Sequence, residues 1–82
     1  MNCGDIVKSL SGHDKDCLYV VVGENSRFVM LADGKNKLLS NPKKKNLKHV
    51  ASIGERVNLE KYNPLYDAHI RKELKGLLKR GG

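Results

Sequence analysis

The sequence has few aromatic residues: it contains three tyrosines, one phenylalanine and no tryptophan among 82 residues. A chain of this length forms one domain with one hydrophobic core. With so few rings, that core must consist mainly of Val, Leu and Ile, which pack well in strands. The composition therefore predicts a single β-rich domain. Because aromatic residues are so few, we expect Tyr19 and Phe28 in the core. Stacking at the surface stays open as an alternative for Tyr19 alone.

Long apolar stretches are also absent. No segment approaches the roughly 18 apolar residues of a membrane span, and no charged start precedes an apolar run as in a secretory signal. We therefore expect a cytoplasmic protein that does not enter a membrane, with Cys3 and Cys17 as reduced thiols. Together with His13 these cysteines would supply three ligands, whereas structural zinc sites have four. Neither a metal nor another cofactor is expected.

The residue sets that carry catalysis are missing. We find no Ser/His/Asp set, no paired carboxylates and no Gly-rich phosphate loop leading into a helix, and a small barrel offers little concavity for a substrate. The aromatic groove with which SH3 domains hold proline-rich peptides is missing too. We therefore expect a binding module and not an enzyme.

Acidic residues are scarce in the second part of the chain. Residues 1–34 contain three Lys/Arg and five Asp/Glu, a net charge of −2, whereas residues 35–82 contain thirteen and four, a net charge of +9. Residues 41–50, NPKKKNLKHV, hold four lysines and no acid. A solvated loop is the simplest interpretation of such a run. The asymmetry of the whole chain nevertheless favours a polyanionic partner, a nucleic acid more than an anionic membrane.

Alternating apolar residues predict five short strands, at residues 4–10, 17–23, 27–32, 35–40 and 46–53. Turn-forming residues 11–16 separate the first two, and Asp33 with Gly34 suits a tight hairpin turn. Pro42 ends the predicted fourth strand because it lacks an N–H group. Five strands joined by tight turns favour a mainly β fold, a small SH3-like barrel.

A helix is predicted from residue 63. Asn63 can cap it, with Pro64 at the first helical position. Apolar and basic residues then occupy opposite sides: Leu65, Ile70, Leu74, Leu77 and Leu78 against Arg71, Lys72, Lys75 and Lys79. We therefore divide the chain into a barrel (1–53), a connector (54–62) and a C-terminal basic amphipathic helix (63–80). The helix can cap the barrel, contact RNA, or do both, and a membrane role is disfavoured because it lacks a Trp or Phe anchor.

Residues 4–23, GDIVKSLSGHDKDCLYVVVG, resemble the KOW motif of ribosomal proteins and NusG-type transcription factors, a strand, a Gly-containing loop and a second strand. The matching positions are Gly4, Asp5, Val7, Gly12, Lys15 and the apolar run 18–22. Asp16 stands where the motif usually has glycine.

Residues 27–50, RFVMLADGKNKLLSNPKKKNLKHV, are similar to small bacterial KOW-domain proteins related to the fourteen-e type of large-subunit ribosomal protein. An ADGK hairpin and a PKxKNLKH segment recur in that group. The resemblance covers about residues 3–53. It implies an SH3-like barrel that binds RNA, ribosomal RNA in the first place.

Charge and resemblance together predict an RNA-binding surface. The candidate RNA-binding residues are Ser11, Gly12, His13, Lys15, Lys35, Lys37, Lys43, Lys44, Lys45, Asn46, Lys48, His49, Arg71, Lys72 and Lys75. We expect the loop and the lysines of residues 35–48 to form one continuous surface, with the side chains of Lys43, Lys44 and Lys45 exposed. His49 is interpreted equally well as an inward residue or as one that stacks on a base.

The expected partner is folded RNA, recognised through its backbone and shape, because exposed aromatic residues for reading bases are scarce. The ribosome is the expected host, and the free protein is expected to be a monomer. Two alternatives stay open: a module that docks a ribosomal or transcription protein, and a DNA-binding barrel.

Overall fold

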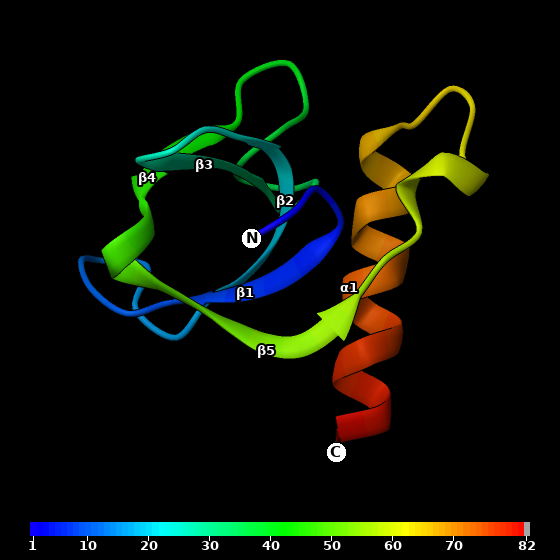
Figure 1. Cartoon of the computed structure of the whole chain (residues 1–82). Helices are drawn as coiled ribbons and strands as arrows, with labels where there is room; N and C mark the ends of the chain where they lie inside the picture. The colour runs from blue at the N-terminus through cyan, green and yellow to red at the C-terminus, as the bar shows by residue number, and fades with distance from the viewer. Residues whose placement is uncertain (82) are drawn as a thin grey trace.

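The computed structural model describes the backbone of residues 1–81 and the side chains of residues 1–78. Five antiparallel strands form one sheet in the order β4-β3-β2-β1-β5. They are β1 (Asp5–Ser9), β2 (Leu18–Glu24), β3 (Phe28–Ala32), β4 (Lys43–Asn46) and β5 (Val50–Arg56). The sheet curls into a small barrel beside the single helix α1 (Asp67–Gly81), as Figure 1 shows. The predicted fold class, mainly β with a C-terminal helix, is confirmed.

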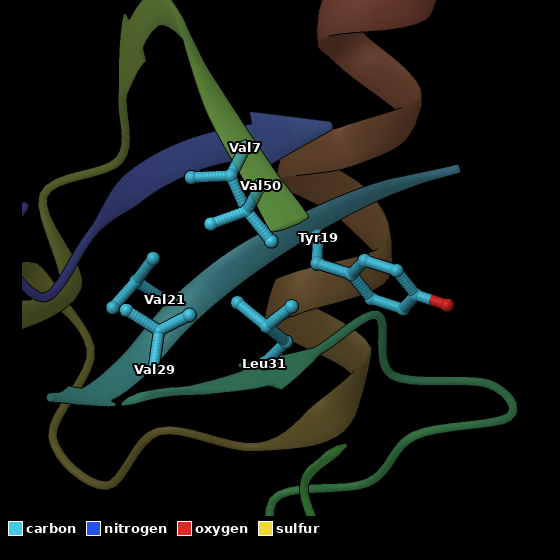
Figure 2. Close-up of a cluster of buried hydrophobic side chains, with 6 residues drawn as sticks. All are labelled: Val7, Tyr19, Val21, Val29, Leu31 and Val50. Carbon is cyan, nitrogen blue, oxygen red and sulfur yellow. The ribbon is translucent and has the colours of Figure 1, made fainter. Parts of the chain in front are cut away.

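Strand β2 buries side chains on both faces of the sheet. On the inner face, Tyr19 and Val21 belong to a cluster inside the barrel, which we call the inner cluster (Figure 2). On the outer face, Val20 packs with Ile6, Ile70 and others in a second cluster, the outer cluster, between the sheet and α1. Residues 18–22 therefore form a continuous apolar run because both faces of β2 are covered.

The helix packs on the barrel, as one of the sequence interpretations required. Ile70 is fully buried and Leu74 nearly so, both in the outer cluster. Leu78, which was assigned to the same apolar side, is 63% exposed and does not take part. The side chain of Lys79, assigned to the basic side, lies outside the described residues.

The prediction of a fourth strand at residues 35–40 is wrong. The Asp33 carboxylate accepts hydrogen bonds from the N–H groups of Lys35 (2.9 Å) and Lys37 (2.8 Å), and these bonds fold the segment into a turn. The chain resumes extended geometry only at Lys43, so the lysine run itself is the edge strand β4. The interpretation of this run as a solvated loop is also wrong.

The boundaries of the last two predicted elements also shift. Residues 47–49 form a 3₁₀-helix, η1 (Leu47–His49), because the side chain of Asn46 accepts the N–H of Lys48, so β5 begins at Val50 and extends past residue 53. A second 3₁₀-helix, η2 (Leu59–Lys61), lies in the connector. Helix α1 begins at Asp67 and not at Pro64, because the N–H of Tyr66 is capped by His69 Nδ1 (3.0 Å).

The turn at residues 33–34 docks on the first turns of α1. Gly34 has a φ of 77°, and a Cβ atom there would clash with the Asp67 carbonyl oxygen. Arg71 Nη1 donates to Gly34 O (2.6 Å), and Asp67 Oδ1 accepts the N–H of Leu39 (2.8 Å). The approach requires glycine, since this backbone region and this spacing exclude a side chain.

We expect helix packing to contribute strongly to stability. Ile70→Ala should lower the free energy of unfolding by about 2 to 5 kcal/mol, because it leaves a cavity between α1 and the sheet. The matched control is Leu78→Ala on the exposed side of the same helix, which should change it by less than about 0.5 kcal/mol. Urea denaturation measures both, and equal effects would contradict this placement of α1.

Candidate nucleic-acid interface

The three consecutive lysines of β4 point to opposite faces of the sheet. Lys43 and Lys45 pair with Leu31 and Val29, whose side chains belong to the inner cluster. Because side chains alternate along a strand, these two lysines lie on the inner face and Lys44 lies on the outer face. The lysine run is therefore not one uniform cluster.

Lys45 is a structural residue. Its Nζ donates to Asp14 Oδ1 (2.8 Å), Ser9 Oγ (2.6 Å) and the Ser11 carbonyl oxygen (2.8 Å), and its side chain is only 10% exposed. Lys43 Nζ reaches the other carboxylate oxygen, Asp14 Oδ2, at 3.1 Å. Of the three side chains predicted to be exposed, only Lys44 is exposed; Lys45 is nearly buried and Lys43 is half-buried, because their ammonium groups pair with a carboxylate in the β1–β2 loop (residues 10–17).

Asp14 is the centre of this network. Besides both lysines, it accepts hydrogen bonds from Ser9 Oγ (3.0 Å) and Tyr19 Oη (3.1 Å). Burial by itself would raise the pKa of Asp14, but the bonds from Lys45, Lys43, Ser9 and Tyr19 together hold this pKa well below its usual range. Asp14 is therefore a carboxylate that needs both lysines.

Tyr19 joins the network to the hydrophobic core. Its ring is 4% exposed, and Figure 2 shows its hydroxyl directed away from the other side chains of the inner cluster. Burial, followed by the charge of Asp14, raises the pKa of the Tyr19 hydroxyl well above its usual value. Tyr19 is a core residue as expected, and the surface-stacking alternative is excluded.

The tip of the β1–β2 loop is open to solvent. Gly12, His13 and Lys15 are exposed, whereas Ser11 is half-buried. Gly12 has a φ of 84°, and in the described part of the chain the N–H groups of Gly12 and His13 have no acceptor. Asp16 also has a positive φ, 71°, which is uncommon for a residue other than glycine. The position at which the KOW motif usually has glycine therefore has the backbone conformation that favours glycine.

The segment after β4 lies beside this loop. The N–H of Leu10 donates to the His49 carbonyl oxygen (2.8 Å), and Figure 1 shows the loop next to η1. Lys44, Lys48 and His49 are exposed, so the inward interpretation of His49 is wrong. The Asn46 side chain caps η1 and is structural. We call this surface the loop face: Gly12, His13, Lys15, Lys43, Lys48 and His49, with Ser11 at its base and Lys44 at its border, on the outer side of β4.

The other candidate residues lie elsewhere. Lys35 and Lys37 belong to the turn that contacts Arg71 of α1. Lys72 and Lys75 are exposed on the helix. We call these five residues the helix face; Figure 1 shows α1 on the side of the barrel opposite η1. The structure therefore joins the β1–β2 loop to Lys43, Lys45 and Lys48 as expected, but directs Lys44 to the other face of the sheet and separates Lys35 and Lys37 from the loop.

Two residues that matter here were missed or misplaced by the sequence interpretation. Asp14 was not among the candidate residues, but it binds the two inward lysines. Phe28 was expected in the core, but alternation with Val29 directs it to the outer face, where it is half-buried and Lys44 Nζ lies 4.2 Å from its ring centroid. Strand alternation could have indicated this placement, because Val29 and Leu31 point inward and Phe28 has the opposite parity.

The described residues show neither a group of metal ligands nor a helix that could span a membrane. Within residues 1–81, no three His, Cys, Asp or Glu side chains are grouped as metal ligands, and Cys3 and Cys17 are exposed free thiols. The described helix, α1, is neither long nor apolar enough to cross a membrane. Neither the family models nor the curated proteins that were searched contain a match to this sequence.

We expect the Asp14 network to stabilise the fold. Asp14→Asn should lower the free energy of unfolding by about 3 kcal/mol, because it leaves Lys45 buried without a counter-charge. The matched control is Asp16→Asn, an exposed acid of the same loop, which should change stability by less than about 0.5 kcal/mol. Chemical denaturation at neutral pH measures both, and an Asp14→Asn variant as stable as the parent would contradict the role of the network.

The same network predicts a pH dependence. The folded-state pKa of Asp14 lies below its unfolded-state value, so its stabilising contribution is complete above that unfolded-state value of about 4. This contribution is lost as the pH falls from about 4 towards the lower pKa that Asp14 has in the folded state. The difference in stability between the parent and Asp14→Asn should therefore shrink as the pH is lowered from about 5 to 2. A difference that stays constant would mean that the pKa of Asp14 is the same in the folded and the unfolded protein.

Proposed function

We propose that this chain is an RNA-binding module that contacts the phosphate backbone of folded RNA through the loop face. The observation that supports this most is the charge arrangement around the β1–β2 loop. Four lysines, Lys15, Lys43, Lys45 and Lys48, lie in or beside this loop with two acids, Asp14 and Asp16, a net charge of +2. Asp14 is enclosed by Lys43 and Lys45, so it does not face a ligand.

The exposed cations of the loop face suit phosphate binding. Lys15, Lys44 and Lys48 carry no acidic partner among the described residues, so each can neutralise a phosphate and release counterions. The exposed backbone at Gly12 allows a phosphate or sugar to approach N–H groups closely. The helix face supplies a second set of cations for a ligand large enough to reach it.

The sequence resemblance of residues 3–53 supports ribosomal RNA as the RNA, the ribosome as the host, and a cytoplasmic, monomeric free protein. The chemistry of the loop face also fits DNA. The experiments below therefore compare an RNA hairpin with the DNA hairpin of the same sequence, since contacts to the 2′-hydroxyl distinguish the two.

The exposed lysines should determine the salt dependence of binding. The double variant Lys44→Gln/Lys48→Gln should weaken binding to an RNA hairpin and should lower the slope of log affinity against log salt by about 0.7 to 0.9 for each lost phosphate contact. Fluorescence anisotropy at several salt concentrations measures the slope.

The matched control removes one cation from the opposite edge of the sheet. Arg56 of β5 is paired with Asp5 (3.1 Å), so Arg56→Gln should leave the slope unchanged. An unchanged slope in the lysine variant, or no measurable binding of any RNA by the parent, would contradict the proposed function. Equal affinity for the DNA hairpin would replace RNA by nucleic acid in general.

Asp16 should weaken RNA binding and should contribute little to the stability of the fold. Asp16→Gly removes a negative charge from the loop face at a position whose φ of 71° glycine adopts freely. We expect stability to change by less than about 1 kcal/mol, because relief at a positive φ and the extra freedom of the unfolded chain oppose each other. RNA affinity should rise a few-fold at low salt. Asp16→Asn, which removes only the charge, should raise the RNA affinity equally, and an unchanged affinity in both variants would place the RNA elsewhere.

A further inference from the structure

Phe28 occupies a part of the outer face that the helix does not cover. Helix α1 packs on the outer face through Ile6 of β1 and Val20 of β2. Strands β3 and β4 lie at the other side of the barrel in Figure 1. There Phe28 is half-buried and, among the described residues, belongs to neither core cluster. It is the only phenylalanine of the chain.

The surroundings of this ring are cationic. Lys44, an exposed residue, places its Nζ 4.2 Å from the ring centroid. The segments that form this surface, residues 25–28 and 43–49, contain no acid. Lys43 and Lys45 point to the inner face, so the cations that these segments leave for the outer surface are Arg27, Lys44 and Lys48, all exposed. An aromatic ring framed by exposed cations and free of acids matches a ligand that carries both a π-face and phosphates.

The backbone under the ring is held in place. The N–H of Phe28 donates to Asn25 Oδ1 (2.8 Å), and the Phe28 carbonyl oxygen accepts the N–H of Asn25 (3.0 Å). On the other side, the N–H of Leu47 donates to the Arg27 carbonyl oxygen (3.0 Å). Phe28 therefore has a fixed position between the β2–β3 turn and η1, as a stacking surface requires.

We infer that Phe28 is a stacking platform for one unpaired nucleobase, and that Lys44 covers the ring in the free protein and moves to a phosphate in the complex. This inference rests on the proposed function and narrows its ligand. The RNA that binds best then carries a bulged or looped-out nucleotide next to a paired segment. The phosphates of that segment contact the loop face, because Lys44 and Lys48 border both surfaces.

Replacement of the Lys44 ammonium group by a nucleobase on the Phe28 ring is favourable. A cation over an exposed aromatic ring contributes a factor of about two to five to an equilibrium. Stacking of a nucleobase on an aromatic side chain contributes a factor of about five to a hundred and fifty. Lys44 loses little when it leaves the ring, because its flexible side chain can pair with the phosphate of the incoming nucleotide.

The test compares three RNA hairpins that differ at one position: a bulged adenosine, the same bulge without its base, and no bulge. The parent protein should bind the bulged adenosine about five-fold or more tightly than the abasic bulge. Phe28→Leu should lose this preference while keeping the salt slope, and Phe28→Tyr should keep it. Tyr66→Leu is the matched control, since Tyr66 is 61% exposed but directly precedes α1.

A measurement on the parent protein does not depend on how any variant folds. The single phenylalanine gives one set of ring protons in an NMR spectrum. These signals should shift upfield with the bulged adenosine and much less with the abasic bulge. Equal affinity for all three hairpins together with unshifted ring protons would overturn the inference and leave the proposed function standing.

Two further outcomes also decide the matter. Loss of the preference in Tyr66→Leu, with Phe28→Leu unaffected, would place the base on Tyr66 and overturn the inference. Absence of binding to every hairpin, at low salt as well, would overturn the proposed function and this inference together.

Discussion

The contact between Lys45 and Asp14 determines how the rest of this small protein is arranged. Strands β3 and β2 lie between β4, which carries Lys45, and β1, which precedes the Asp14 loop, so backbone pairing does not join the two. The bonds from Lys45 to Asp14, Ser9 and Ser11 connect them across the curled sheet. They hold the β1–β2 loop against the lysine strand, and thereby create the loop face.

A buried ion pair of this kind is stable only when its remaining hydrogen-bonding capacity is used. Desolvation of an ammonium and a carboxylate group costs several kcal/mol per ion unless other partners compensate. Here Ser9, Tyr19 and Lys43 supply those partners, and no buried side-chain nitrogen or oxygen within the described residues lacks one. The network also withdraws an acid from a basic surface. A phosphate at this surface therefore meets Lys43 and not an exposed Asp14.

Sequence patterns predicted the parts of the fold whose burial is local. Strands β1 to β3 and the packing of Ile70 follow from apolar periodicity, and the loop at Gly12 follows from turn chemistry. Strand β4 could not be predicted in the same way, because Lys43 and Lys45 are inward residues only through Asp14, about 30 residues earlier in the chain. Composition alone placed Phe28 in the core, but the inward position of its neighbour Val29 excludes this.

The register of β4 against β3 connects the Asp14 network to the Phe28 ring. Lys44 lies opposite Met30, on the same face as Phe28 and diagonal to it, so its ammonium group reaches the ring. A slip of β4 by one residue would exchange the faces of all three lysines. Lys44 would then turn inward towards Asp14, and Lys43 and Lys45 would turn outward. The slip would leave Asp14 with one inward lysine in place of two, so the pairing of both Lys43 and Lys45 with Asp14 favours the observed register. The interaction that closes the barrel thus also keeps a cation over Phe28.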